Sequence, residues 1–208
     1  MIPARGGSRE SKGGLRVAKK RFASGRREEL LDGVMGIIAA RGFSEVKVAE
    51  MAEELHCSVA TLYKIAPNKD SLVALAIRHW ARQTLEYAET RAQQGSTASD
   101  RARAYYLAGV ERVRPMSHAF RSDMERFESS RLAYRALSDA FIDRFAELLD
   151  DAVKADEIRP VNTRFLAHVM RQMAFVVRDE PVLLASGLTA EQALLETDRL
   201  IWDGLRTR

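Results

Sequence analysis

Residues 26–72, RREELLDGVMGIIAARGFSEVKVAEMAEELHCSVATLYKIAPNKDSL, decide the fold that we expect for this chain. Near the beginning of this stretch, apolar residues recur at the i, i+4, i+7, i+8 spacing of a helix, and Arg41-Gly42 then supplies a typical helix end. The pattern predicts an amphipathic helix over residues 26–41. Its buried positions are Leu30, Val34, Ile37 and Ile38.

Two shorter helices follow within the same stretch. Apolar spacing predicts a helix over residues 48–55, the His56-Cys57 pair breaks it, and Ser58 suits the N-cap of a third helix ending near Lys64. Two short helices joined by a tight turn are typical of a helix-turn-helix, whose second helix enters the major groove. Such pairs are also common in ordinary helical bundles, so the spacing alone leaves both interpretations open.

The residue types narrow this choice. The stretch contains, in order and without a gap, Gly42-Phe43, Val48-Ala49-Glu50-Met51-Ala52, Ser58, Thr61-Leu62-Tyr63-Lys64, Pro67, Lys69 and Leu72. In this it resembles the tetracycline-repressor (TetR/AcrR) family of transcriptional regulators. The resemblance implies a helix-turn-helix domain followed by a ligand-binding and dimerisation domain. It also implies a repressor that binds a palindromic operator as a homodimer and is released by a small, largely apolar effector.

The resemblance further implies which residues meet double-stranded DNA. Ser58 caps the recognition helix, the three residues after it face base edges, and Tyr63 and the lysines contact phosphate, where ammonium groups release counterions. Tyr63 could instead pack inside the domain, as we expect for Leu62. The predicted DNA-binding residues are Lys47, Ser58, Val59, Ala60, Thr61, Tyr63, Lys64 and Lys69.

Several residues depart from the family pattern. His56 stands where the family has glycine in the turn, which is unfavourable if the backbone there is left-handed. Val46-Lys47 replaces two hydroxyl residues and so loses a helix cap, while Ala49 and Ala66 replace a basic and an aromatic residue. These departures motivate an alternative function, a helical effector- or partner-binding protein that has lost specific DNA binding.

The remainder of the chain also has helical periodicity, so the expected fold class is all-α with about nine helices. Predicted helices cover residues 69–94, 98–114, 117–128, 163–178 and 189–206, with a long amphipathic helix between the third and fourth of these. We expect a basic, disordered arm over residues 1–25, a DNA-binding domain over 26–72, and a ligand-binding and dimerisation domain over 73–208. The Gly6-Gly7 and Gly13-Gly14 pairs favour disorder in the arm.

Charge is distributed unevenly between the arm and the rest. The chain carries +4 overall, yet residues 1–27 alone carry nine basic residues against Glu10, a net charge of +8, which leaves −4 for the remaining residues. A basic arm on a mildly acidic body suggests a polyanionic partner such as DNA. Such arms are equally often solvated without a partner.

Aromatic and methionine residues concentrate in the second half. Most of them must be core, but as a set they could line a cavity between helices, where bundle proteins bind ligands. The predicted ligand-binding residues are Trp80, Tyr87, Tyr106, Phe120, Met124, Tyr134, Phe141, Met170 and Met173. Residues 163–178 carry apolar residues on two helical faces, which indicates a helix between two layers. With the family resemblance, this predicts dimerisation through the last two helices.

Other classes of protein receive no support from the sequence. Cys57 is the single cysteine, so no intrachain disulfide can form, which fits a reducing cytoplasm. No apolar run approaches the length of a membrane span, and no signal peptide is predicted. The four histidines have no metal-binding spacing with Cys57 or with one another. We find no catalytic constellation and no cofactor motif, and therefore predict neither metal, cofactor nor enzymatic activity.

Overall fold

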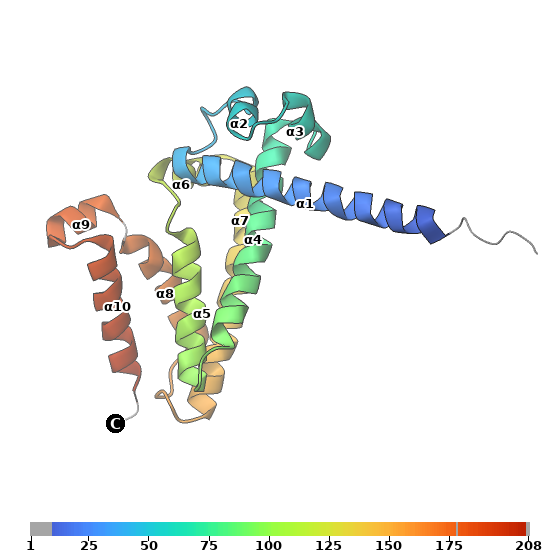
Figure 1. Cartoon of the computed structure of the whole chain (residues 1–208). Coiled ribbons are helices and arrows are strands. Elements are labelled where there is room, and N and C mark those ends of the chain that lie inside the picture. The colour runs from blue at the N-terminus through green and yellow to red at the C-terminus, as the bar shows by residue number, and fades with distance from the viewer. Residues whose placement is uncertain (1–9, 178, 207–208) are drawn as a thin grey trace, which may run out of the picture. The chain divides into compact units, whose positions relative to one another are not determined.

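A computed structural model describes residues 10–177 and 179–206, with side chains from Gly25 onward. Over these residues the chain is all-α. An isolated antiparallel β-bridge joins Ile158 and Arg206. Figure 1 shows the helices, which are α1 (Glu10–Arg41), α2 (Val48–Glu54), α3 (Val59–Ile65), α4 (Lys69–Ala92), α5 (Ala98–Val113), α6 (His118–Arg126), α7 (Glu128–Lys154), α8 (Thr163–Val176), α9 (Glu180–Ser186) and α10 (Ala190–Leu205).

The predicted fold class is confirmed, with two differences in the helices. The first helix begins at Glu10, whereas we expected an arm without helix over residues 1–25, of which residues 1–9 lie outside the described part. Once a helix has been nucleated, lysine, arginine, alanine and leucine extend it at little cost in free energy. Their high helix propensity outweighs the low propensity of the glycines in this segment. The second difference is α9, which the sequence did not predict. It starts around Pro181 and ends at Gly187, whose φ is +68°.

The chain divides into two compact units, each with its own buried residues. The first comprises residues 1–80 and 116–131, and the second comprises 81–115 and 132–208. The division falls inside α4 and near the start of α7, so these two helices contribute to both units. It differs from the boundary expected at residue 72, because the first unit includes α4 as far as Trp80 and also α6, which packs against α1.

In the first unit, α1 is joined to α6 and to α4 by polar contacts. The Ser117 amide, at the start of α6, donates to the Ala39 carbonyl at 2.8 Å. The buried His79 ring lies 2.9 Å from the Asp32 carboxylate, through Nε2 and Oδ1. Phe43, just after α1, packs edge-on against Phe120 of α6 with ring centroids 6.0 Å apart.

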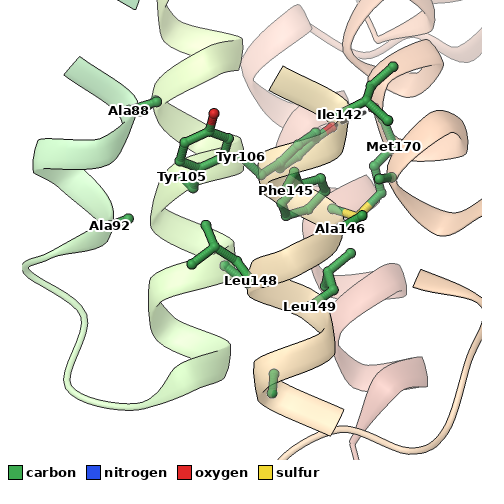
Figure 2. Packing of buried hydrophobic residues seen from close by; sticks show 14 of the residues in the cluster. Ala88, Ala92, Tyr105, Tyr106, Ile142, Phe145, Ala146, Leu148, Leu149 and Met170 are labelled. Atoms are coloured by element: carbon green, nitrogen blue, oxygen red, sulfur yellow. Dashed lines mark hydrogen bonds between the residues drawn. The ribbon is translucent and has the colours of Figure 1, made fainter. Parts of the chain in front are cut away.

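The second unit has an aromatic core between α5, α7 and α8. Tyr105 stacks on Phe141 with ring centroids 4.6 Å apart, and Tyr106 stacks on Phe145 at 5.6 Å. Figure 2 shows Tyr106, Phe145 and Met170 gathered together, and the Tyr106 hydroxyl donates to the Met170 carbonyl at 3.1 Å. Burial raises the pKa of Tyr105 and Tyr106, so both remain neutral phenols.

Ion pairs join helices at the edges of this core. Arg144 of α7 forms a two-pronged pair with Glu89 of α4, at 3.0 and 2.9 Å. Arg103 of α5 likewise forms a bidentate salt bridge with the buried Asp198 of α10 and donates to both of its carboxylate oxygens. Among the described residues, no helix combines the length and apolar character needed to cross a membrane.

Candidate nucleic-acid interface

Helices α2 and α3 are joined by a tight turn with a left-handed residue at its centre. The Cys57 amide donates to the Ala52 carbonyl at 2.9 Å, and the His56 amide donates to the Glu53 carbonyl at 3.0 Å. These two bonds are the pattern of a Schellman helix end, which requires a left-handed residue just after the helix. His56 supplies it with φ of +49°. The left-handed backbone expected at this departure from the family is therefore present, and with it its conformational cost.

The start of α3 is capped as predicted. Ser58 is the N-cap, with an extended backbone, and its side-chain oxygen accepts from the Thr61 amide at 3.1 Å. The hydroxyls of Ser58 and Thr61 are also within 2.9 Å of each other. The cap satisfies one of the N–H groups that a helix start leaves free.

The start of α2, in contrast, has no side-chain cap. Lys47 is its N-cap residue, is exposed, and makes no capping hydrogen bond. This agrees with the loss of the hydroxyl residues noted in the sequence. The Lys47 ammonium is therefore on the surface, where it is able to meet a phosphate.

Helix α3 presents polar and basic groups to solvent while Leu62 anchors it. Leu62 is fully buried, as expected, whereas Tyr63 is 47% exposed, so its ring is not part of the core. Lys64 and Ala60 are exposed, and Val59 and Thr61 are partly so. The sequence of α3 contains no acidic residue, whereas α2 carries Glu50, Glu53 and Glu54. Of the two helices, α3 is the one whose surface a polyanion can approach without repulsion.

Lys69 has a structural partner. It lies at the start of α4, and its ammonium donates to the Ser44 carbonyl at 2.9 Å, which ties α4 to the segment between α1 and α2. An ammonium has three N–H donors, so this bond leaves others for a phosphate. The neighbouring Asn68 caps α4 by accepting from the Ser71 amide at 2.8 Å.

The sequence analysis missed a carboxylate that belongs to this unit. Asp123 of α6 accepts from the amides of Phe43 at 2.5 Å and Ser44 at 2.8 Å. Burial by itself raises the pKa of Asp123, but the hydrogen bonds from Phe43 and Ser44, together with the positive charge of Arg126, lower the pKa below its usual value. No local pattern could have revealed a pair separated by 80 positions.

The predicted ligand-binding residues are divided between the two units. Trp80, Phe120 and Met124 belong to the first unit and are buried there. The other predicted residues belong to the second unit, where Tyr106 and Met170 are in the aromatic core and Tyr87 and Phe141 pack against it. Tyr134 and Met173 are partly buried in that unit outside this core. Within the described residues, no group of three potential metal ligands occurs.

Comparison with known proteins agrees with this architecture. Residues 30–76 match the model of a family described as bacterial regulatory proteins, tetR family. No curated protein matches the chain in sequence. Among solved structures, a TetR-family transcriptional regulator from Rhodococcus sp. is similar, with a TM-score of 0.70 and 21% identity, over 88% of this chain and 100% of that one.

Two further solved structures contain bound molecules. A transcriptional regulator from Saccharomonospora viridis in complex with choline has a TM-score of 0.76 and 16% identity, over 89% of this chain and 100% of that chain. AibR in complex with isovaleryl coenzyme A and operator DNA has a TM-score of 0.61 and 20% identity, over 84% of this chain and 97% of that chain. At these identities the likeness establishes the fold.

Proposed function

We propose that this member of the tetR family of bacterial regulatory proteins is a transcriptional repressor that binds a palindromic operator as a homodimer. A small, largely apolar effector releases it, and it works in the bacterial cytoplasm. The matched family is one of regulators, and the chain is a regulator rather than an enzyme. The observation that carries the proposal is the capped helix α3, which is free of acidic residues and exposes Tyr63 and Lys64.

Each residue at this surface has a role in the proposal. Val59, Ala60 and Thr61 face base edges, where the Thr61 methyl group can pack on a thymine methyl group. The Tyr63 hydroxyl and the Lys64 ammonium bind phosphate oxygens, as do the lysines at the starts of α2 and α4. The bond between Lys69 and Ser44 gives that lysine a second role in holding the domain together.

The homodimer rests on exposed apolar residues of α8 and α10. Met170 of α8 and Val177, just after the end of α8, are buried, whereas Phe165 on the other face of α8 is 68% exposed. On α10, Leu200 is 77% exposed and Leu195 is also exposed. Large apolar residues that stay exposed in one copy favour burial against another copy, and a two-fold interface uses the same surface twice. Such a dimer reads two half-sites about 34–36 Å apart, or at a related spacing.

The effector part of the proposal rests on the aromatic residues of the second unit and on the solved relatives that bind small molecules. In the proposal, the effector contacts the rings of Tyr87, Tyr106 and Phe141 and the side chain of Met170. A ligand shifts the DNA-binding equilibrium only by its difference in affinity between the two states, so operator DNA must weaken effector binding by the same factor.

Fluorescence anisotropy tests the DNA-binding proposal. The titration compares a duplex from the region upstream of the chain's own gene with a duplex of the same composition in scrambled order. We expect preference for the upstream duplex and a change of that preference in Thr61→Ala. In Lys64→Ala the salt slope should fall by about one per half-site, hence by about two for the homodimer. Equal affinity for both duplexes would favour the alternative function, a helical effector- or partner-binding protein, for which His56, Ala49 and Ala66 are the motivation.

A further inference from the structure

Asp123 occupies an unusual place for a carboxylate. It is 6% exposed, lies on α6, and falls outside residues 30–76 that match the family model. Its Oδ2 atom accepts two hydrogen bonds from the consecutive amides of Phe43 and Ser44. A buried charge is tolerated when its hydrogen bonds are satisfied, and two N–H donors on one carboxylate oxygen provide that here.

These amides belong to the corner between α1 and α2. Gly42 ends α1 with φ of +76°, and a Cβ atom at this position would lie 2.7 Å from the Asp123 Oδ2 atom. The close approach of the carboxylate therefore depends on a glycine. From the other end of the same peptide segment, the Lys69 ammonium holds the Ser44 carbonyl at 2.9 Å. The corner is thus fixed by an anion at its amides and by a cation at its carbonyl.

The chain continues from this corner into α2, which begins at Val48. Because Lys47 provides no side-chain cap, the first turn of α2 has no capping side chain of its own to fix its entry. The turn after α2 is short and is closed by the backbone hydrogen bonds from His56 to Glu53 and from Cys57 to Ala52, so a displaced α2 would carry α3 with it. A misplaced corner would therefore displace the exposed residues of α3 from their DNA contacts.

We propose that Asp123 is a positioning residue for DNA binding, which holds the Phe43–Ser44 corner so that α2 and α3 are presented in one arrangement. Asp123 itself does not contact DNA. The inference rests on the proposed function, and it gives α6 a role in positioning the helices that bind DNA. When only a fraction of molecules has the competent arrangement, the apparent affinity falls by that fraction.

The test is the DNA affinity of Asp123→Asn, with Glu125→Gln as its matched control on the exposed side of the same helix. Removing a carboxylate lowers repulsion from phosphate, so Glu125→Gln should bind DNA equally or slightly more tightly. Hydrogen bonds to a charged acceptor are strong, and we expect Asp123→Asn to bind the upstream duplex about tenfold more weakly, against the electrostatic trend. Amide hydrogen exchange should be faster at Phe43 and Ser44, while the α3 amides stay protected.

Further arms separate the possible failures. Asp123→Glu keeps the charge but moves the carboxylate by one methylene, so it should also bind DNA more weakly. It provides the test if Asp123→Asn proves unable to fold. Circular dichroism and sedimentation verify that each variant is folded and assembled like the unmodified chain. Unchanged DNA affinity in a folded Asp123 variant would overturn the inference and leave the proposed function intact. Lack of preference for the upstream duplex in the unmodified chain would overturn both.

Discussion

Replacing Ser58 separates the stability of α3 from its contact with DNA. Ser58→Ala removes the hydroxyl that accepts from the Thr61 amide. Losing such a cap costs about 1 kcal/mol of folding free energy. Helix α3 has seven residues and one buried side chain, Leu62, so it has little packing to compensate for the loss. If the cost falls on the DNA-competent state, about 1 kcal/mol weakens DNA binding about fivefold for one half-site, and about 30-fold for the two half-sites of the homodimer.

Ser58→Asp should keep the stability of α3 while weakening its contact with DNA. Aspartate is as good an N-cap as serine and its charge suits the positive end of a helix, so we expect the free energy of unfolding to be retained. A phosphate next to the new carboxylate repels it. The repulsion energy is about 1 kcal/mol for unit charges about 4 Å apart in water. Two half-sites double this to about 2 kcal/mol, which corresponds to about 30-fold weaker binding.

The assay pairs urea unfolding, followed by circular dichroism, with anisotropy titrations of the upstream duplex at low and high salt. The Ser58→Asp penalty should shrink as salt rises, because salt screens exposed charges. Ser122→Asp, which adds the same charge at an exposed position of α6, controls for the change in net charge. A folded Ser58→Asp variant with undiminished DNA affinity would refute the assignment of α3 as the recognition helix.

Three more predictions concern strain, assembly and pH. His56→Gly should raise the free energy of unfolding by about 0.5–1 kcal/mol in urea titrations, because relief of the left-handed penalty exceeds the entropy cost of glycine; a loss of stability would contradict the strain argument. Leu200→Glu should yield a monomer by sedimentation at micromolar concentration, whereas Leu132→Glu, at another exposed leucine, should not; a dimeric Leu200→Glu would exclude that residue from the interface. The Glu157 carboxylate accepts from the amides of the first turn of α5, first of all that of Ser99, which lowers its pKa from 4.5 to about 2. Because its folded pKa lies below the unfolded value, its stabilisation is complete above pH 4.5 and is lost as the pH falls towards 2. Glu157→Gln should therefore lower stability at neutral pH and flatten the acid dependence of urea unfolding, and an unchanged acid profile would argue against this pairing.

The sequence by itself determined the features that depend on neighbours a few positions away. Ser58 caps α3 through an amide three residues on, and Gly42 ends α1 with a positive φ. His56 adopts the left-handed backbone that its place in the turn requires. Such hydrogen bonds and backbone preferences are set within a single turn, so residue type and spacing suffice to predict them.

Helix ends without a strong local signal were harder to predict. The start of α1 at Glu10 was missed because charged residues and glycines suggest disorder, while the same lysines and arginines are good helix formers once a helix exists. Helix α9 was missed because seven residues are too few to show a helical period.

Only the tertiary structure decided which distant groups meet. Asp123 reaches the amides of Phe43 and Ser44 across 80 positions, and Arg103 pairs with Asp198 across 95. Neither pair has a sequence pattern, because the packing of whole helices brings these groups together. The same packing places Phe120 against Phe43 in the first unit and Tyr106 in the aromatic core of the second unit. Residue type alone could nominate both for one ligand site, whereas the compact unit to which each belongs depends on which helix surfaces fit together.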